Sequence, residues 1–304
     1  MSLGQQDAKL IVSGRHADPF SVLGMRPVEG GLSVCAYIPG AERIDVLDAK
    51  TDRSVLKLEP VANAAGLFYG VTKRRKKPFH YLLMPTAKGQ TWRQHDPYGF
   101  TSVLGELDLH LFSEGDHRRL WRAMGANLIT HQGVEGTHFA VWAPNARRVS
   151  VVGDFNGWNG STHVMRARGH TGIWELFVPG IGEGEHYKYE IMDRNGHVLP
   201  QKADPLGLGS EHPPSTASIV RRLKGHAWND DPWMDQRAKR HAIDQPISIY
   251  EVHLGSWKRV LEDQGRSLSS LEHATQLVDY VKDMVLHRLV VRMQVLCARY
   301  DGVD

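Results

Sequence analysis

The chain has 304 residues and a formal net charge of +3, and 41% of its residues are hydrophobic and 23% charged. This composition is ordinary for a globular protein with room for two or three domains. The small net charge does not favour nucleic acid or an anionic membrane as a partner, and no apolar run is long enough to predict a membrane span. Cys35 and Cys297 lie far apart and indicate no disulfide framework, and residues 1–9 lack the apolar core of a signal peptide. We therefore expect a cytoplasmic setting.

Residues 10–106 are expected to form a first β-sandwich module. Turn residues surround a short apolar segment at residues 16–24, and residues 32–38 alternate as a half-buried strand does. Further short strands are predicted at residues 44–47, 55–58 and 79–84. Short strands separated by turn signals about eight to twelve residues apart are typical of an all-β sandwich.

Residues 128–224 repeat this pattern. Three pairs of residues share a nearly constant offset of 105, 106 and 108 positions: Tyr37 and Trp142, Tyr81 and Tyr187, and Asp96 and Asp204. Three anchors at nearly one spacing argue against a chance match. The sequence therefore predicts two tandem immunoglobulin-like β-sandwich modules of about a hundred residues each. Two polar segments, residues 107–127 and 225–245, are expected to be linkers, and residues 107–124 are expected to be helical or irregular.

The organisation changes at residue 246. Residues 247–254 are rich in Ile and Val, which predicts a buried strand, and residues 267–284 carry apolar side chains at helical spacing. A strand followed by a helix is the first unit of an α/β barrel, but a full barrel of this type needs about 250 residues. From Pro246 to Asp304 there are 59 residues. The expected fold class is therefore mainly β, with two sandwiches followed by the first βα unit of an incomplete (β/α)8 barrel.

The sequence contains one run of basic residues, at residues 73–77. Nucleic-acid and nuclear-signal functions are open for such a run. It lies between two predicted strands, ends at Pro78 and has no interleaved aromatic residues, so we expect a solvated hairpin turn and no nucleic-acid site. The 17 histidines form no His-Glu-x-x-His motif and the cysteines no paired spacing, so no metal site is expected.

Residues 247–257, with the sequence ISIYEVHLGSW, resemble the first barrel strand of 1,4-α-glucan branching enzymes in family 13 of the glycoside hydrolases. The resemblance covers roughly residues 10–284. It implies the N-terminal part of an enzyme that cuts an α-1,4-glucan and re-attaches the freed segment through an α-1,6 link, as a monomer and without a cofactor. Two tandem modules, residues 16–24 and residues 250–257 together favour branching over debranching members of the family, which remain an alternative.

The resemblance also implies where the catalytic residues of the family lie. Retaining glycosyl transfer needs two carboxylates about 5 Å apart. In the resembled family they follow the fourth and fifth barrel strands, and the 304 residues contain no such segment. We therefore assign no catalytic residue and expect this chain alone to be inactive. A non-catalytic glucan-binding protein is the alternative of a different class.

The resemblance stops at about Met284. Residues 285–304 carry no family motif and show no turn before the expected second strand. Our hypothesis is that the reading frame shifts there and leaves an unrelated tail. A divergent strand of a naturally shortened protein is the alternative.

Residues 151–160, with the sequence VVGDFNGWNG, form a second signature. A strand followed by Gly, Asn and Asp predicts a turn that displays an indole. The segment resembles the start of family 48 carbohydrate-binding modules. In their glycogen-targeting members a tryptophan at the position of Trp158 stacks on glucose, and a lysine at the position of Lys188 bonds hydroxyls. An aromatic face suits the C–H surface of a sugar and a charged donor suits its hydroxyls, so Trp158 and Lys188 are expected to bind glycogen or another α-1,4-glucan.

Packing of Trp158 against a neighbouring domain is the competing interpretation. Glycogen-targeting modules carry a second tryptophan where this chain has His197. The repeat places Arg53 and Leu82 at the positions that correspond to Trp158 and Lys188. The first module is therefore expected to be structural.

Overall fold

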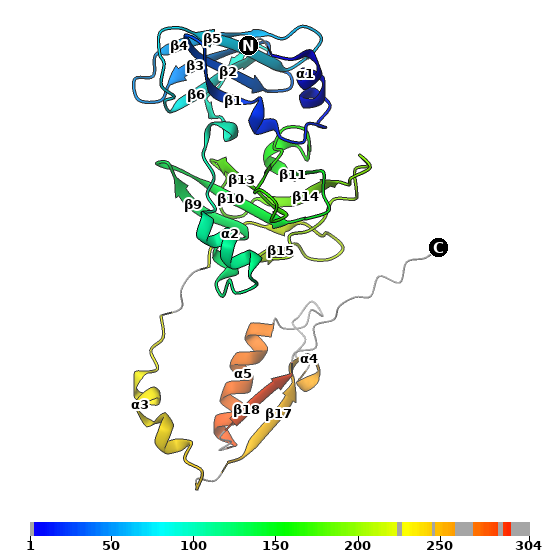
Figure 1. The fold of residues 1–304 in the computed structure, drawn as a ribbon. Helices are drawn as coiled ribbons and strands as arrows, with labels where there is room; N and C mark the ends of the chain where they lie inside the picture. Colours follow the sequence, from blue (N-terminus) through cyan, green and yellow to red (C-terminus); the bar gives the residue numbers. More distant parts are fainter. Residues whose placement is uncertain (1–2, 224–226, 245–246, 259–269, 285–287, 293–304) are drawn as a thin grey trace, which may run out of the picture. The chain divides into compact units, whose positions relative to one another are not determined.

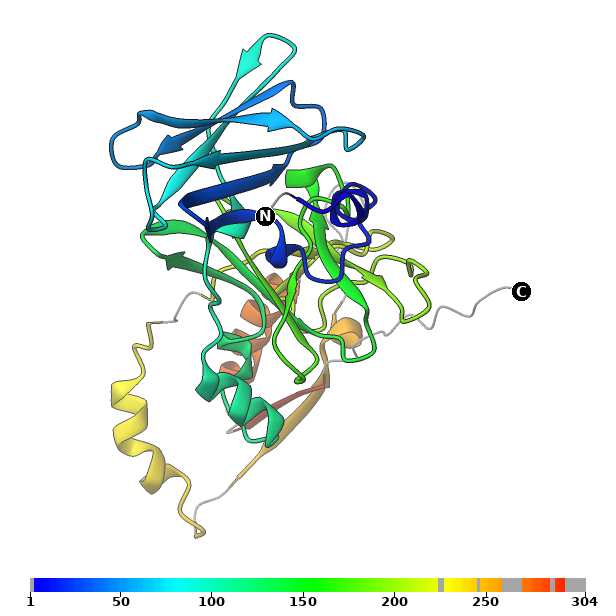
Figure 2. The same ribbon diagram turned by 45° about the horizontal axis from the view of Figure 1, so that its top comes forward.

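A computed structural model describes residues 3–223, 227–244, 247–258, 270–284 and 288–292. The chain divides into two compact units, Met1–Lys224 and Gly225–Asp304, and each is described by itself. The first unit holds two β-rich modules, drawn from blue to yellow-green in Figures 1 and 2. Among the described helices, none has the length and apolar character that crossing a membrane requires.

The first module is an antiparallel sheet that folds over its own core. The sheet order is β1-β2-β5-β4-β3-β6-β7, with β8 beside β6. β4 pairs with β5 only at Glu59 and Pro60 and with β3 over more of its length, so the sheet turns there into two layers. Val34, Ile44 and Leu83, from both layers, are buried in one core. The strands are β1 (Gly24–Val28), β2 (Gly31–Tyr37), β3 (Arg43–Asp48), β4 (Ser54–Pro60), β5 (Leu67–Thr72), β6 (Tyr81–Ala87), β7 (Gln90–Thr91) and β8 (Gln94–His95).

β2 is buried on both faces, so the prediction of a half-buried strand is wrong here. Val34 lies in the module core, whereas Cys35 packs against Ala8 and Ile11 of helix α1 (Gln5–Val12). Successive side chains of a strand point to opposite faces, and α1 supplies the cover for the outer one. This helix was not predicted, because it begins in a polar stretch and its eight residues are too few to show a clear helical period.

The second module consists of two four-stranded antiparallel sheets, ordered β12-β13-β10-β9 and β11-β14-β16-β15. Phe139 and Leu176 from the first sheet meet Val151 and Tyr187 from the second in a buried core. The strands are β9 (Gly125–His131), β10 (Val134–Trp142), β11 (Arg148–Gly153), β12 (Arg166–Ala167), β13 (Ile173–Pro179), β14 (His186–Met192), β15 (Gly209–Ser210) and β16 (Ser218–Ile219). The first unit is therefore mainly β and antiparallel, as the sequence predicts.

One buried hydrogen bond recurs in both modules. The Tyr81 hydroxyl donates to Asp96 Oδ2 at 2.6 Å, and the Tyr187 hydroxyl donates to Asp204 Oδ2 at 2.7 Å. Each carboxylate also accepts the backbone N–H of the residue two positions later. Burial raises the pKa of Asp96 to about 6 and raises the pKa of Asp204 in the same direction. The residues that the sequence repeat aligned are thus partners in one structural element, which explains why both modules carry them.

The segment between the modules packs onto the second one. It contains helix α2 (Glu106–Ser113) and a 3-10 turn, η3 (Leu120–Arg122), before β9 begins at Gly125. Leu109 and Phe112 of α2 contact a buried cluster that includes Ile173. The segment that was expected to be a linker is therefore partly helical, and its apolar side chains are used in packing.

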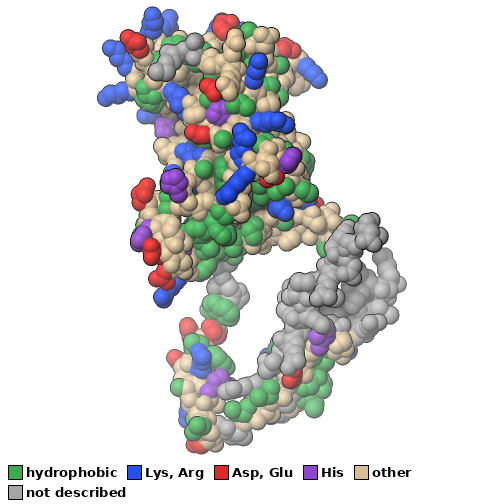
Figure 3. All heavy atoms as spheres, turned by 45° about the vertical axis from the view of Figure 1, so that its right-hand side comes forward, with side chains coloured by type: hydrophobic (Ala, Val, Ile, Leu, Met, Phe, Trp, Pro, Cys, Tyr) green, Lys and Arg blue, Asp and Glu red, His purple; other side chains and the backbone are tan. Residues whose placement is uncertain are grey.

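The basic residues 73–77 lie in the loop between β5 and β6. These two strands are not neighbours in the sheet, so the prediction of a hairpin turn is wrong: the chain crosses from one layer to the other. Arg75 forms an ion pair with Asp48 at 2.5 Å, and its guanidinium carbon lies 4.2 Å from the centre of the Phe79 ring. Figure 3 shows the blue Lys and Arg side chains at the top of the first module interspersed with red acidic and tan uncharged ones.

The second unit contains a strand–helix–strand arrangement. β17 (Ile249–His253) pairs in parallel with β18 (Arg288–Arg292), and helix α5 (Ser270–Asp283) lies between them in sequence. Val252 of β17 packs against Leu277 and Val281 of α5. The strand and the helix were predicted, but β17 is mostly exposed instead of buried, because one helix covers one face of a two-stranded sheet. Two further helices are α3 (Asp231–Arg240) and α4 (Leu254–Trp257).

β18 falls within residues 285–304, where the sequence showed no family motif. A strand therefore follows α5 in this segment, in parallel register with β17 from Ile249 opposite Arg288 onward. Residues 293–304, and with them Cys297, lie outside the described residues.

Candidate functional site

The turn after β11 displays Trp158. Gly157 and Trp158 both adopt the left-handed backbone conformation, with φ of 60° and 61°. The side chain of Asn156 fixes the turn, since its Oδ1 accepts the Gly153 N–H at 3.0 Å and its Nδ2 donates to the Val151 carbonyl at 3.0 Å. Two consecutive left-handed residues reverse the chain sharply, and the Trp158 side chain stays half-exposed.

A chain of polar contacts connects Trp158 with the strand that carries Lys188. The indole Nε1 donates to Asp154 Oδ1 at 3.0 Å, and Asp154 Oδ2 lies 3.2 Å from His186 Nδ1. His186 begins β14, and Lys188 lies two residues further on the same face, about 7 Å along the strand. Lys188 Nζ donates to Thr216 Oγ1 at 2.8 Å. The structure thus brings the two predicted residues to one end of one sheet.

This end of the sheet combines the groups that a sugar requires. The indole offers an apolar face, Lys188 an ammonium donor and Thr216 a hydroxyl. Asp154 holds the indole in one orientation, which reduces the entropy lost when a ligand stacks on it. The sequence analysis missed Asp154, His186 and Thr216. Period-two alternation with Lys188 could have identified His186, but Thr216 is 28 residues away from Lys188 and has no local signal.

The later part of the same loop contacts the first module. The Tyr98 hydroxyl donates to the Thr162 carbonyl at 3.2 Å and accepts the Val164 N–H at 3.0 Å. The Trp158 indole bonds within its own module. The hydrogen bonds between this loop and the first module therefore come from Thr162 and Val164.

The other positions that the sequence analysis compared with glycogen-targeting modules carry no tryptophan. His197 lies in the hairpin after β14, with its side chain 77% exposed and its Nδ1 3.3 Å from Asp193 Oδ2. In the first module, Arg53 is exposed and Leu82 is half-buried in β6. Neither matches an indole or an ammonium group.

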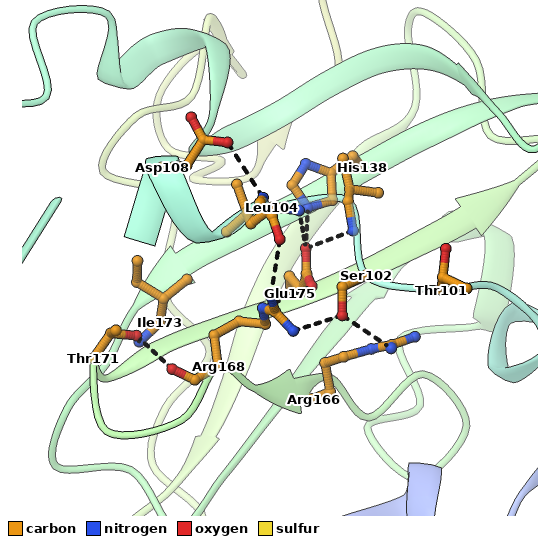
Figure 4. Close-up of polar contacts among 12 residues, drawn as sticks. Thr101, Ser102, Leu104, Asp108, His138, Arg166, Arg168, Thr171, Ile173 and Glu175 are labelled. Atoms are coloured by element: carbon orange, nitrogen blue, oxygen red, sulfur yellow. Dashed lines mark hydrogen bonds and ion pairs between the residues drawn. The ribbon is translucent and has the colours of Figure 1, made fainter. Parts of the chain in front are cut away.

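A buried polar network holds the chain between the modules (Figure 4). Glu175 Oε2 accepts the backbone N–H groups of Val103 and Leu104 at 3.2 and 3.0 Å and lies 3.0 Å from His138 Nε2. Arg168 lies 3.1 Å from the other Glu175 oxygen and donates to the Leu104 carbonyl. Burial disfavours the charged form of Glu175, but the hydrogen bonds from His138 and Leu104 outweigh it and hold the pKa of the carboxyl below its ordinary value. This ionised group ties the segment after the first module to the core of the second.

Two family models match the chain. Residues 4–98 match that of the alpha-1,4-glucan branching enzyme GlgB N-terminal domain. Residues 123–207 match carbohydrate-binding module 48, the isoamylase N-terminal domain. The two matched ranges correspond to the two β-rich modules of the first unit.

Curated relatives extend the similarity beyond these modules. The chain is 57% identical over 284 residues to the 1,4-alpha-glucan branching enzyme GlgB of Roseobacter denitrificans, with 93% of this chain and 39% of the relative covered. It is 48% identical over 278 residues to the enzyme of the same name from Paramagnetospirillum magneticum, with 91% of this chain and 37% of the relative covered. The chain thus spans less than half the length of these relatives.

Among solved structures, apo pullulanase from Klebsiella pneumoniae matches 84% of this chain with 31% of its own, at 17% identity and a TM-score of 0.38, too weak a likeness to support an argument. The sequence relatives and the family model of residues 4–98 agree with each other. The chain corresponds to the N-terminal part of the 1,4-alpha-glucan branching enzymes named GlgB.

Proposed function

We propose that the end of the second module around Trp158 binds an α-1,4-glucan such as glycogen. Trp158 stacks on a glucose ring, and Lys188 donates to a hydroxyl of the same or the next sugar. The observation that carries this proposal is the contact chain from the indole through Asp154 to His186, which holds the ring on the face that presents Lys188. A fixed aromatic surface beside a charged donor is a common arrangement for a polyhydroxyl ligand.

The complete protein to which this chain corresponds would cut an α-1,4-glucan and form an α-1,6 branch through a covalent glucosyl-enzyme intermediate. The proposal rests on the relatives, which carry the name of this activity. In that protein the two modules would be immunoglobulin-like sandwiches, and β17, α5 and β18 would begin a (β/α)8 barrel, since parallel strands joined by a helix are its repeating unit. We propose that the present chain contributes glucan binding and not the chemistry, as a cytoplasmic monomer without a cofactor.

Glycogen binding by the full chain tests the proposal. Trp158→Asn removes the ring, and Asn tolerates the left-handed backbone at this position. We expect co-sedimentation with glycogen to weaken at least about tenfold, since a lost contact of about 1.4 kcal/mol has this effect. Trp142→Asn is the matched control: this indole is 56% exposed on β10, and its loss should change binding less than about twofold. Equal retention of the Trp158 variant and the native chain would overturn the proposal.

The alternative of a non-catalytic glucan-binding protein predicts the same binding. The two differ in the complete protein that contains this chain: branch formation by that protein would support the first, and its absence would support the second. Branch formation by this chain alone would contradict the view that it contributes binding without chemistry.

A further inference from the structure

We infer that the cleft between the two modules of the first unit is a second carbohydrate site, which takes a short neutral oligosaccharide. The choice of α-1,4-linked glucose as its sugar rests on the proposed function. The cleft has a volume of about 410 Å³, within the range of ligand pockets of roughly 300–1,000 Å³. Trp158 and Lys188 are not among its lining residues, although the turn that carries Trp158 contributes Phe155, Asn156 and Asn159 to it.

The lining of the cleft carries almost no charge. Among the residues that the structure describes, no Lys, Arg or Glu contributes to it, and its one carboxyl group, Asp96, is buried and already accepts the Tyr81 hydroxyl. His163 also lines the cleft, and burial lowers its pKa to about 4, so the ring is neutral near pH 7. An unpaired ion moved from water into such a site loses its hydration without gaining a partner. The cleft therefore selects against phosphates, nucleotides and acidic or basic peptides.

Three side chains of the lining keep hydrogen-bonding nitrogens for a ligand. Gln94 Oε1 accepts the Trp92 indole at 2.8 Å, and Asn159 Oδ1 accepts the Ser161 N–H at 2.9 Å. Within the described part of the chain, neither amide nitrogen takes part in a recorded hydrogen bond. His163 Nδ1 lies 3.1 Å from Asn156 Nδ2 and 3.0 Å from Thr162 Oγ1, which leaves Nε2 for a ligand. Two amide donors and one neutral imidazole nitrogen suit the hydroxyl and ring oxygens of a sugar.

Aromatic residues give the cleft an apolar surface for the face of a sugar ring. Tyr37 and Tyr98 from the first module and Phe155 from the second line the same cleft. Aromatic surface beside neutral donors distinguishes a sugar site from a purely apolar one, which would accept lipid or a hydrophobic side chain.

The cleft is held in place by contacts across the module interface. Tyr98 bonds Thr162 and Val164, and the Arg166 guanidinium donates to the Phe100 carbonyl at 2.5 Å and lies 3.7 Å from the centre of the Phe20 ring. A preformed site binds without the cost of ordering its walls, which matters for weak sugar ligands.

The test uses isosteric changes that leave the internal hydrogen bonds intact. Gln94→Glu and Asn159→Asp keep the oxygens that accept from Trp92 and Ser161, but each removes an amide donor and adds a negative charge to the cleft. Gln90→Glu with Asn195→Asp is the matched control, since both residues are exposed and neither lines the cleft. Thermal melts of all forms establish that each is folded.

Calorimetric titration of the full chain with maltotetraose gives the readout. In the Trp158→Asn background we expect one remaining site. Gln94→Glu with Asn159→Asp should lower its affinity for maltotetraose at least about tenfold, and the control pair should change this affinity less than about twofold. The inference is overturned if the cleft changes leave the affinity of the Trp158 variant unaltered, or if this variant no longer binds at all. If Trp158→Asn has no effect and the cleft changes abolish binding, the proposed function fails and the cleft stands. Absence of binding by every form at millimolar sugar would overturn both.

Discussion

The two modules of the first unit share one plan and differ in the turn that follows one strand. In both, this turn places a residue in the left-handed region, Asp52 at φ 59° and Gly157 at φ 60°, 105 positions apart. The next residue is an exposed arginine, Arg53, in the first module and Trp158 in the second. The comparison teaches that the buried residues maintain the common fold, whereas the exposed turn is free to differ. Under the proposed function, Trp158 in this turn is the residue that gives the second module a surface for a ligand.

The largest effect is expected at the connection between the modules. Glu175→Ala leaves the Arg168 guanidinium without its ion-pair partner and the buried N–H of Leu104 without its acceptor. Removing one partner of a buried ion pair costs about 3–5 kcal/mol, so the first unit should unfold at a much lower urea concentration. Glu135→Ala, at an exposed position of β10, is the control and should unfold at nearly the same urea concentration as the native chain. A native midpoint for the Glu175 variant would show that the modules do not depend on this network.

The pH dependence of stability tests the buried Tyr81–Asp96 hydrogen bond of the first module. The pKa of Asp96 is about 6 in the folded chain, above its ordinary value of 3.8, so the folded state binds more protons than the unfolded one between these values. The contribution of Asp96 is therefore full below about pH 4 and declines by up to about 3 kcal/mol as the pH rises through 6. Asp96→Asn should remove this decline in urea unfolding measured between about pH 4 and 7. An unchanged slope would contradict the assignment.

The buried Tyr81–Asp96 and Tyr187–Asp204 hydrogen bonds are expected to contribute differently to stability. Tyr81→Phe deprives Asp96 of its one side-chain donor among the described residues. After Tyr187→Phe, in contrast, the Asp204 carboxylate still accepts the Tyr189 hydroxyl at 3.1 Å. An unsatisfied buried group costs about 1–3 kcal/mol, and the Tyr81 variant should lie nearer the upper end of this range than the Tyr187 variant. Urea unfolding of the two variants gives the order of their losses in unfolding free energy. The reverse order would mean that the Tyr189 hydroxyl does not compensate Asp204 for the loss of Tyr187.

The smallest effect is expected at Lys188. Lys188→Ala removes one donor to the proposed glucan and its bond to Thr216, a loss of about 1 kcal/mol, or roughly fivefold in affinity. Because the side chain is partly exposed, the melting temperature should stay nearly constant. Leu82→Ala, at the corresponding position of the first module, should leave glycogen binding as it was. A larger loss from the Leu82 variant than from the Lys188 variant would show that the first module binds glucan directly.

The sequence by itself determined the features that repeat over short distances. Alternation and turn residues predicted β3, β4 and β6, and the constant offset aligned Tyr81 with Tyr187 and Asp96 with Asp204. The Gly- and Asn-rich turn around Trp158 was likewise readable, because backbone conformation there depends on the residues of the turn itself.

Only the tertiary structure decided which surfaces are covered and which distant side chains meet. The cover of β2 by α1, the position of His186 beside Asp154, and the binding of residues 103 and 104 by Glu175 all join segments between about 25 and 70 residues apart. Such contacts leave no period in the sequence, since they depend on the packing of whole strands and not on neighbouring residues. For the same reason the strand β17 looked buried in sequence, although the described part of its sheet leaves one face open.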